Sequence, residues 1–152
     1  MGHLVIPNFQ NQKMGKVSTQ LTLTNRADRI RAESGDIDFC NVRSTTVENA
    51  VVDTGATLLC LPKGVIDRLG LTFDRDVPVT TATGVKTARI FRDVELTIGD
   101  RTGTFDCLEL PGGTDVLLGV TPMEILGLEP DLQNQCLREL PTNFDRTYLS
   151  AL

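Results

Sequence analysis

Apolar and polar residues alternate with a period of two along much of this chain. The clearest case lies between Val17 and Leu23, where valine and leucine side chains are separated by polar ones. Successive residues of a β-strand point to opposite faces, so the pattern predicts a strand with one buried face. The same reasoning and short apolar runs predict further strands at residues 44–53, 58–61, 77–81, 85–90, 94–98, 104–110, 115–119 and 136–140.

Turns that contain glycine separate several of these runs. Gly84 follows Ala82-Thr83 between two of the expected strands, where a hairpin needs a residue that tolerates positive φ. Residues 99–103 begin and end with glycine and predict a second turn. The segment 25–35 is charged and ends in glycine, so it is either a loop or a short surface helix.

Two further segments carry the start and stop signals of short helices. Residues 62–69 begin with proline at the first helical position, and Gly70 follows them. Residues 121–124 read Thr-Pro-Met-Glu, a capping box with proline at the first helical position, and Gly127 lies one turn further on. Proline is favoured at helix starts and glycine just after helix ends, so we expect a helix at each place.

Together these elements indicate an all-β fold, a small closed β-barrel with one or two short helices. The strands do not alternate with long helices, which argues against a doubly wound parallel sheet. Residues 1–14 are polar with little periodicity and are expected to form a flexible arm. Residues 15–141 then form the single domain, and residues 142–152 form a C-terminal tail.

Charge and hydropathy narrow the possible partners. The net charge is −5, and the densest basic stretch, residues 26–31, contains Asp28 and is followed by Glu33. Nucleic acids and anionic membranes bind to basic faces, so we expect neither as a partner. The chain shows no secretory signal and no apolar run long enough to span a membrane, which predicts a cytoplasmic protein.

The cysteines and the single histidine do not form a recognisable metal site. The four cysteines are widely spaced, and apolar neighbours indicate buried free thiols. They are Cys40, Cys60, Cys107 and Cys136. His3 lies in the expected arm, so a Ser-His-Asp centre is not expected either. We therefore expect no metal and no cofactor.

One short motif stands out as a candidate for chemistry. Asp53-Thr54-Gly55 directly follows two valines and precedes the apolar run 58–61. Such a triplet arises by chance in about 2–3% of chains of this length, and in isolation a surface turn would be its ordinary explanation. Here, however, it lies between two apolar runs, and an ionised carboxylate resists burial there. A tight turn would let main-chain N–H groups and the Thr54 hydroxyl hold the carboxylate.

These motifs resemble those of the retropepsin-like aspartic proteases. Asp53-Thr54-Gly55-Ala56, the hairpin near Gly84 and the run Leu117-Leu118-Gly119 before a helix occur in the order seen in that family. The resemblance covers the chain from Met14 to about Leu140 and is greatest to small bacterial single-domain members.

The resemblance implies a fold, a site and a partner. It implies that Asp53, Thr54 and Gly55 are catalytic and that the Leu117-Leu118-Gly119 strand lies beside their loop. It also implies a flap formed by the hairpin near Gly84. The substrate-binding residues would then be Ala56, Ala82, Thr83, Gly84 and Leu118.

The implied mechanism needs two aspartates, and this chain offers only one Asp-Thr-Gly. Asp115 lacks the Thr-Gly that would have to follow it. The expected enzyme is therefore a homodimeric aspartic endopeptidase that cleaves peptides or unfolded proteins, with Thr54 bonding across the two-fold axis to its mate. A pair of close carboxylates shares one proton, because like charges resist joint ionisation.

Some features depart from the family pattern and leave alternatives open. Val120 stands where many relatives place an arginine, the flap has one glycine, and the only tyrosine is Tyr148. The alternatives are a catalytically silent binding or regulatory module and a weak dimer that becomes active on a partner or at high concentration. The arm before Met14 is either a start-site extension or a segment that the enzyme trims from itself.

Overall fold

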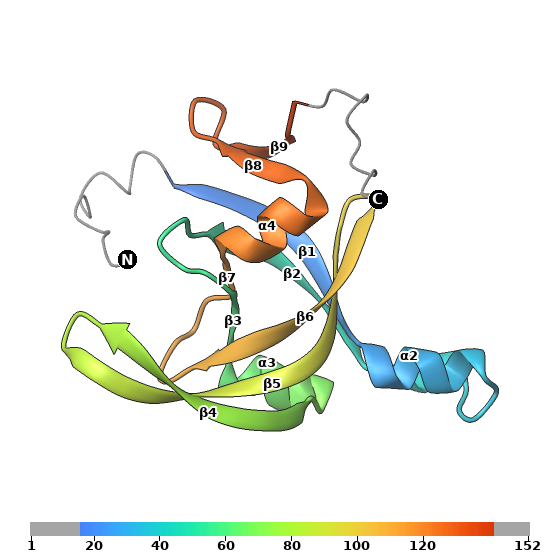
Figure 1. Ribbon diagram of the computed structural model, residues 1–152. Coiled ribbons are helices and arrows are strands. Elements are labelled where there is room, and N and C mark those ends of the chain that lie inside the picture. Colours follow the sequence, from blue (N-terminus) through green and yellow to red (C-terminus); the bar gives the residue numbers. More distant parts are fainter. Residues whose placement is uncertain (1–15, 142–152) are drawn as a thin grey trace, which may run out of the picture.

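The computed structural model describes residues 16–141, and nearly all of them belong to one β-barrel with attached elements (Figure 1). The strands are β1 (Val17–Asn25), β2 (Ser44–Val52), β3 (Leu59–Pro62), β4 (Thr72–Thr81), β5 (Gly84–Ile98), β6 (Arg101–Leu110), β7 (Leu117–Leu118), β8 (Leu128–Asp131) and β9 (Cys136–Glu139). The helices are α2 (Arg26–Glu33), α3 (Lys63–Leu69) and α4 (Val120–Leu126), with a 3-10 turn, η2 (Phe39–Asn41). The expected arm and tail lie outside the described residues.

A continuous sheet closes on itself to form the barrel. Its strand order is β1-β2-β7-β3-β6-β5-β4, and β1 also pairs with β5. Six strands therefore form a closed ring, and β4 extends outward beside β5. β8 and β9 form a separate two-stranded sheet, and β9 contacts β1. The all-β closed barrel expected from the sequence is confirmed.

The charged segment after β1 is a helix, so the barrel carries three short α-helices instead of one or two. Asn25 caps α2, because its side chain accepts a hydrogen bond from the N–H of Asp28. The Asp28 carboxylate, itself buried, accepts hydrogen bonds from the backbone and guanidinium of Arg43. Hydrogen bonding to Arg43 lowers the pKa of Asp28. This ion pair between a buried carboxylate and a partly exposed arginine joins α2 to the start of β2.

The helix stops were predicted correctly, but the helix starts were not. Gly70 and Gly127 end α3 and α4 in the left-handed conformation, with φ of 63° and 73°. Pro62, however, lies one position before the first residue of α3. The prediction that residues 121–124 form a capping box is also wrong. α4 already begins at Val120, after Gly119, and no side chain caps it. The backbone of the preceding loop supplies the missing partners, as described below.

The hairpin near Gly84 is confirmed and is longer than its apolar pattern suggested. Thr81 pairs with Gly84, which leaves a two-residue turn, and Gly84 has φ of 120°. β5 continues to Ile98 as one strand, with a bulge where Asp93 adopts φ of 62°. The next turn contains only two residues, since Ile98 pairs with Arg101. Bulges of this kind bend a strand without ending it, which the sequence pattern did not reveal.

The cysteines are divided between the interior and the surface. Cys60 and Cys107 are buried free thiols, as expected. Cys40 and Cys136 are exposed, so the prediction that all four are buried is wrong. Both exposed cysteines lie in short elements at the edge of the fold, η2 and β9, where apolar neighbours in the sequence do not provide cover. In residues 16–141 no helix has the length and apolar character needed to cross a membrane.

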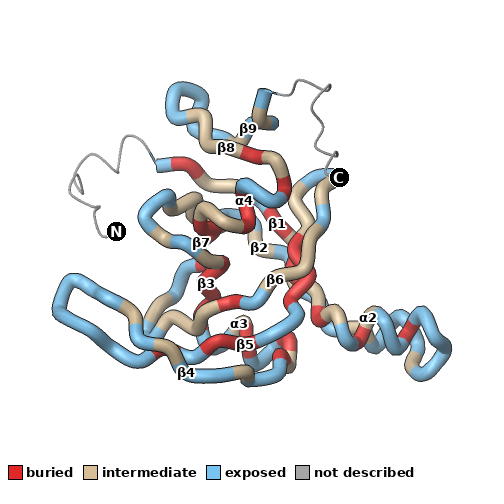
Figure 2. Tube along the Cα trace, in the orientation of Figure 1, coloured by how far each residue is buried: buried red, intermediate tan, exposed pale blue. Residues whose placement is uncertain are grey.

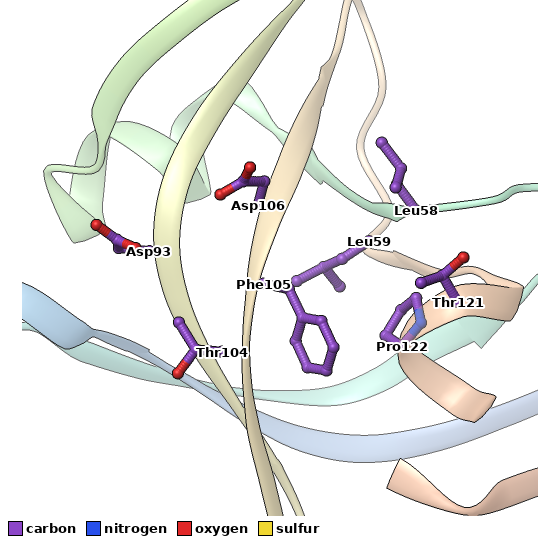
Figure 3. A pocket seen from close by; sticks show the side chains of 8 residues that line it. All are labelled: Leu58, Leu59, Asp93, Thr104, Phe105, Asp106, Thr121 and Pro122. Carbon is purple, nitrogen blue, oxygen red and sulfur yellow. The ribbon is translucent and has the colours of Figure 1, made fainter. Parts of the chain in front are cut away.

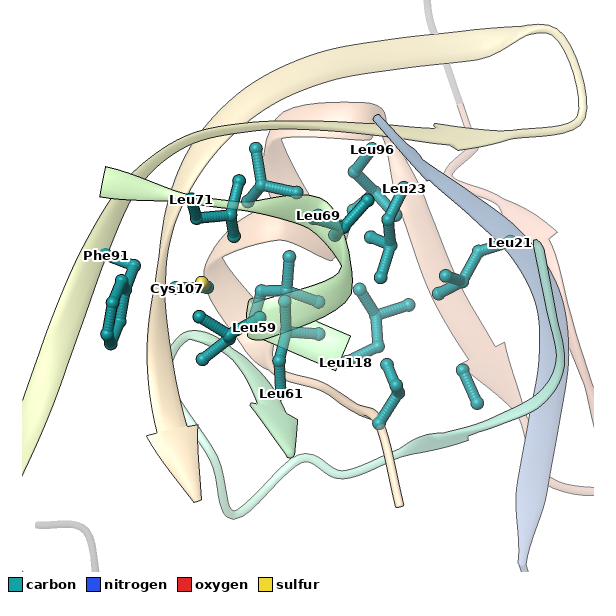
Figure 4. Close-up of a cluster of buried hydrophobic side chains, with 14 of the residues drawn as sticks. Leu21, Leu23, Leu59, Leu61, Leu69, Leu71, Phe91, Leu96, Cys107 and Leu118 are labelled. Carbon is teal, nitrogen blue, oxygen red and sulfur yellow. The ribbon is translucent and has the colours of Figure 1, made fainter. Parts of the chain in front are cut away.

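Strand register divides the central strands into two rows of side chains. The inner row faces the barrel interior and crosses β2, β7, β3, β6 and β5. It consists of Val52, Leu118, Leu59, Cys107 and Phe91, which are successive register partners. Four of these five residues are buried members of the hydrophobic core (Figure 4), and Val52 packs against it. Figure 2 shows the corresponding buried segments along the strands.

The residues that alternate with the inner row form a second row on the outside of the barrel. This outer row consists of Val51, Leu117, Cys60, Leu108 and Ile90, again successive register partners on the same five strands. None of the five belongs to the core cluster or packs against it. The outer face of a barrel strand ordinarily carries polar side chains, so an entirely apolar outer row needs a separate explanation.

Candidate active site

Asp53 directly follows β2 and is held in a tight turn. Its N–H donates a hydrogen bond to the carbonyl oxygen of Leu118 over 3.0 Å, which joins the turn to β7. Its carboxylate oxygen Oδ1 accepts a hydrogen bond from the N–H of Gly55 at 2.8 Å, and its own carbonyl accepts from Ala56 N–H at 3.1 Å. Asp53 is half-buried; Gly55 N–H orients its carboxylate, and the bonds to Leu118 and Ala56 fix its backbone.

The loop after Asp53 lies tightly against the start of α4. The N–H of Val120 donates to the carbonyl of Ala56, and the N–H of Thr121 donates to the carbonyl of Thr57, both over 2.9 Å. These bonds satisfy helix N–H groups that a capping side chain would otherwise serve. They explain why α4 begins without the predicted capping box.

Gly119 is the residue that allows this close approach. A Cβ atom on Gly119 would lie 2.3 Å from the carbonyl oxygen of Leu58 and 2.7 Å from that of Ala56. Both neighbours are backbone atoms, so neither can rotate away as a side chain could. The Leu117-Leu118-Gly119 strand thus lies beside the Asp53 turn because position 119 carries no side chain.

The outer row leads across the barrel to Asp53. Val51 is two residues before Asp53, and residues two apart in a strand point to the same face. The electrostatic influence of Asp53 on Cys60 agrees with this placement. Burial raises the pKa of the Cys60 thiol to about 12, and the nearby negative charge of Asp53 adds to the rise. A carboxylate therefore lies at one end of the apolar outer row.

The expected flap residues lie apart from this turn. Ala82, Thr83 and Gly84 are exposed at the tip of the β4–β5 hairpin. The hydrogen bonds at the tip stay within the hairpin, where the hydroxyl of Thr81 donates to the carbonyl of Gly84 at 2.8 Å. Figure 1 shows the hairpin extending from the barrel as a separate arm. None of these hydrogen bonds joins the tip to a residue outside the hairpin.

The side chain of one expected substrate-binding residue, Leu118, is not accessible. Leu118 is fully buried, with 0% of its surface exposed, and belongs to the core cluster. Its carbonyl oxygen holds Asp53, but its side chain faces the interior. Leu117, the half-buried neighbour, belongs to the outer row instead. The sequence could not separate the two, because residues 116–118 are all apolar and give no alternation to assign faces.

Thr54 and Gly55 are exposed, and Ala56 is half-buried; Gly55 bonds to the Asp53 carboxylate and Ala56 to the Asp53 carbonyl. Cys60, Leu108 and Ile90 were not among the expected residues. Counting in steps of two back from Asp53 would have found Val51. The remaining outer-row residues follow only from the register of strands that are distant in the sequence.

A cavity of about 360 Å³ lies elsewhere on the domain (Figure 3). It is lined by Leu58, Leu59, Asp93, Thr104, Phe105, Asp106, Thr121 and Pro122. Neither Asp53 nor any outer-row residue contributes to it. Leu58 belongs to the loop that follows Asp53, and Thr121 contacts that loop through the carbonyl of Thr57. Between residues 16 and 141, no group of three or more histidine, cysteine, aspartate or glutamate side chains is placed to hold a metal ion.

Comparison with known proteins adds one finding. Residues 39–122, more than half of the chain, match the protein family described as "Aspartyl protease". The matched segment contains the Asp53 turn, the hairpin, the whole outer row and the Gly119 contact. A search of curated proteins found no match.

Proposed function

Because this chain belongs to the aspartyl protease family, we propose that it is an aspartic endopeptidase in which Asp53 is the catalytic carboxylate of each of two identical subunits. The observation that carries the proposal is the Asp53 turn itself. Gly55 N–H and the Leu118 carbonyl fix the carboxylate and its backbone at the end of an apolar strip. A structural surface turn would not require this combination of a fixed carboxylate and a neighbouring apolar surface.

The second subunit enters because the chemistry requires two carboxylates around one water molecule. In residues 16–141 Asp53 is the one aspartate followed by Thr-Gly. A two-fold axis beside the exposed Thr54 would bring two copies of Asp53 together, with each Thr54 bonding to the opposite turn. The two carboxyl groups would titrate as a pair, because their like charges resist simultaneous ionisation.

Hydrolysis then proceeds by general acid–base catalysis. The ionised aspartate accepts a proton from the water while the protonated aspartate donates a hydrogen bond to the scissile carbonyl oxygen. The water oxygen attacks the carbonyl carbon and forms a tetrahedral intermediate. The C–N bond breaks as the nitrogen receives a proton from the pair, which leaves one proton shared between the two aspartates again. The hydroxyl and the hydrogen of the water thus appear on the two product ends.

The outer row supports an apolar peptide as substrate. Leu117, Leu108 and Val51 are half-buried, and their neighbours Cys60 and Ile90 are 5% and 2% exposed. An extended peptide that lies across these strands would cover the exposed parts of Leu117, Leu108 and Val51 with alternate side chains, while Cys60 and Ile90 are already buried. Each apolar side chain that leaves water there contributes favourably in proportion to its buried area.

The decisive experiment replaces Asp53 by asparagine, which keeps the shape of the side chain and its hydrogen bond from Gly55. We expect cleavage of an unfolded protein to fall by about 10²–10⁴-fold with no loss of folded structure. Asp115→Asn is the matched control, since Asp115 is exposed and precedes β7. It should cleave at the parental rate.

Sedimentation of the same proteins tests the dimer. The parent and Asp53→Asn should both form dimers in the concentration range in which the parent cleaves. Cleavage by Asp53→Asn at the parental rate would refute the catalytic assignment, and activity from a strict monomer would refute the shared site. If the parent binds apolar peptides but never cleaves them, the protein is a binding module.

A further inference from the structure

We propose that the cavity beside the start of α4 (Figure 3) is a second binding site, and that it takes an aliphatic cation. The ligand class is an ammonium or guanidinium group on an apolar stem, as in the side chain of lysine or arginine. The site shares no lining residue with the outer row and does not include Asp53. It therefore goes beyond the proposed function, and its occupation does not depend on catalysis by Asp53.

The cavity exists because β6 has a neighbouring strand on only one side along its first half. β5 pairs with residues 101–108 of β6, whereas β3 pairs only with residues 107–110. On the open side the last residue of α4 packs against β6, since a Cβ added to Gly103 would lie 3.2 Å from a methyl carbon of Leu126. A space of about 360 Å³ remains where α4 begins. The hollow thus follows from the strand pairing and not from the rotamer of one side chain.

Apolar side chains form one wall of the cavity. Leu59 and Pro122 are both fully buried, and the ring of Phe105 lies near them in Figure 3. Leu59 belongs to the core cluster and Phe105 packs against it, so this wall is held by the interior of the barrel. A cavity of a few hundred Å³ with apolar walls and a few polar groups is the usual form of a small-ligand site. The wall suits the apolar stem of a ligand.

Two carboxylates supply the charge of the site. Asp93 and Asp106 line the cavity, and within residues 16–141 neither side chain forms a hydrogen bond or a salt bridge. Glu95 and Glu109, on the same two strands, are by contrast each bonded to an arginine. None of the lining residues is basic. A cation is therefore the charge that the cavity would attract.

The lining favours an organic cation over a metal ion. A divalent metal needs more donors, and in the described part of the chain no third histidine, cysteine, aspartate or glutamate joins the two carboxylates. A nearby cation of the protein, Arg26, donates to the Thr104 hydroxyl at 2.6 Å rather than to either carboxylate. Because Asp93 and Asp106 are exposed, their attraction is weak and is screened by salt. Tight binding therefore also requires an apolar stem against the wall.

The cavity also adjoins the joint between α4 and the loop after Asp53. Leu58 belongs to that loop, and the N–H of Thr121 donates to the Thr57 carbonyl over 2.9 Å. A ligand that contacts Leu58 and Thr121 lies against both sides of this joint and favours its closed form. Because the bound ligand must leave before the joint opens, a ligand concentration of about nine times Kd should slow hydrogen exchange at Thr121 N–H about tenfold.

The test follows the backbone amides of the full chain by NMR at low salt, in the Asp53→Asn variant so that cleavage plays no part. The probes are pentylamine, pentanol and pentanoate, which share a stem and differ in charge. We expect pentylamine to shift the amides of Leu58, Asp106 and Thr121 saturably and to bind about fivefold more tightly than pentanol. Pentanoate should not bind. The blocked tripeptide Ala-Lys-Ala identifies the source of the ligand: binding as tight as that of pentylamine indicates a polypeptide, and binding of pentylamine alone indicates a free amine.

Matched double variants separate the site from the net charge of the protein. Asp93→Asn with Asp106→Asn removes both carboxylates, and asparagine tolerates the φ of 62° at position 93. Asp76→Asn with Asp100→Asn removes the same charge from exposed positions outside the cavity. The first pair should weaken pentylamine binding about fivefold, and the control pair should bind like its parent.

Equal affinities for pentylamine and pentanol would overturn the proposal, and so would an equal loss of binding in both pairs of variants. Unchanged exchange at Thr121 in the saturated protein would overturn the coupling to the Asp53 loop. A protein that binds pentylamine in the cavity but never cleaves peptides would support the second site and refute the proposed function. The two failures are therefore distinct.

Discussion

The five central strands carry apolar side chains on both faces, and the two faces differ in what covers them. The inner row meets side chains from the opposite wall of the barrel and from α3 and α4, so folding alone explains it. The outer row lies outside that core cluster. Leu117 and Leu118 are adjacent in β7, yet they lie in these two different environments. Apolar character on the inner face therefore serves stability, whereas on the outer face Val51, Leu108 and Leu117 remain partly exposed.

This contrast also explains the position of the carboxylate. Asp53 continues the outer face of β2 after Val51, while Val52 continues the inner one. A shift of register by one residue would place the carboxylate in the core and Val52 outside. The hydrogen bond from Asp53 N–H to the Leu118 carbonyl fixes the register at this position. The inner row thus supports the site without contributing a side chain to it.

The largest effect that separates the two faces is expected from alanine at neighbouring positions of β7. Leu118→Ala removes a fully buried side chain from the core and should lower the free energy of unfolding by about 2–5 kcal/mol. Leu117→Ala removes a half-buried side chain and should lower it by under about 1 kcal/mol. Urea denaturation of the two variants measures the difference.

The same pair should behave in the opposite way in a peptidase assay. Leu117→Ala should raise KM for an apolar peptide by about tenfold, because it removes part of the binding surface. Folded Leu118→Ala should retain the parental KM. Equal stability losses in the two variants would contradict the division into an inner and an outer face.

The next effect concerns Gly119, which follows Leu118 of the inner row and packs against the loop after Asp53. Gly119→Ala places a Cβ 2.3 Å from a backbone oxygen and should cost about 1–3 kcal/mol of stability. It should also displace the Asp53 turn and lower kcat. Gly64→Ala in α3 is the control, since a Cβ there meets no atom within 4 Å. That substitution should be neutral or slightly stabilising, because alanine favours helices.

A Gly119→Ala variant with parental stability and kcat would show that the loop relaxes freely. The tight packing between loop and strand would then not be what positions Asp53. Thermal unfolding and steady-state kinetics on the two glycine variants are sufficient to decide.

The local elements were easier to predict from the sequence than the outer row. Alternation from Val17 to Leu23, the glycine helix stops and the Asp-Thr-Gly turn are local signals, and each predicted its element. The outer row is not local, because its members come from strands separated by up to 66 residues, from Val51 to Leu117. Runs that are apolar throughout, such as residues 116–118, carry no alternation, so the sequence could not place the Leu118 side chain on the inner face.

The start of α4 was predicted wrongly for a related reason. A capping box is a local pattern, and residues 121–124 fit it. In the fold, the carbonyl groups of Ala56 and Thr57 accept the hydrogen bonds from the first helix N–H groups. A long-range partner thus replaced a local one, and the helix begins two residues earlier than the box would allow.

The smallest effect distinguishes the two buried thiols, one on each face. Burial raises the pKa of both Cys60 and Cys107 from about 9 to about 12, but the charge of Asp53 contributes only at Cys60. Because the folded state favours the neutral thiols, stability is unaffected below pH 9 and declines as the pH rises from about 9 to 12. The slope is at most about 1.4 kcal/mol per pH unit for each thiol. Asp53→Asn should lower the pKa of Cys60 and leave that of Cys107 unchanged, as followed by thiolate absorbance in variants that retain one of the two thiols. An equal response of both thiols, or none at Cys60, would mean that the carboxylate does not lie on the outer face.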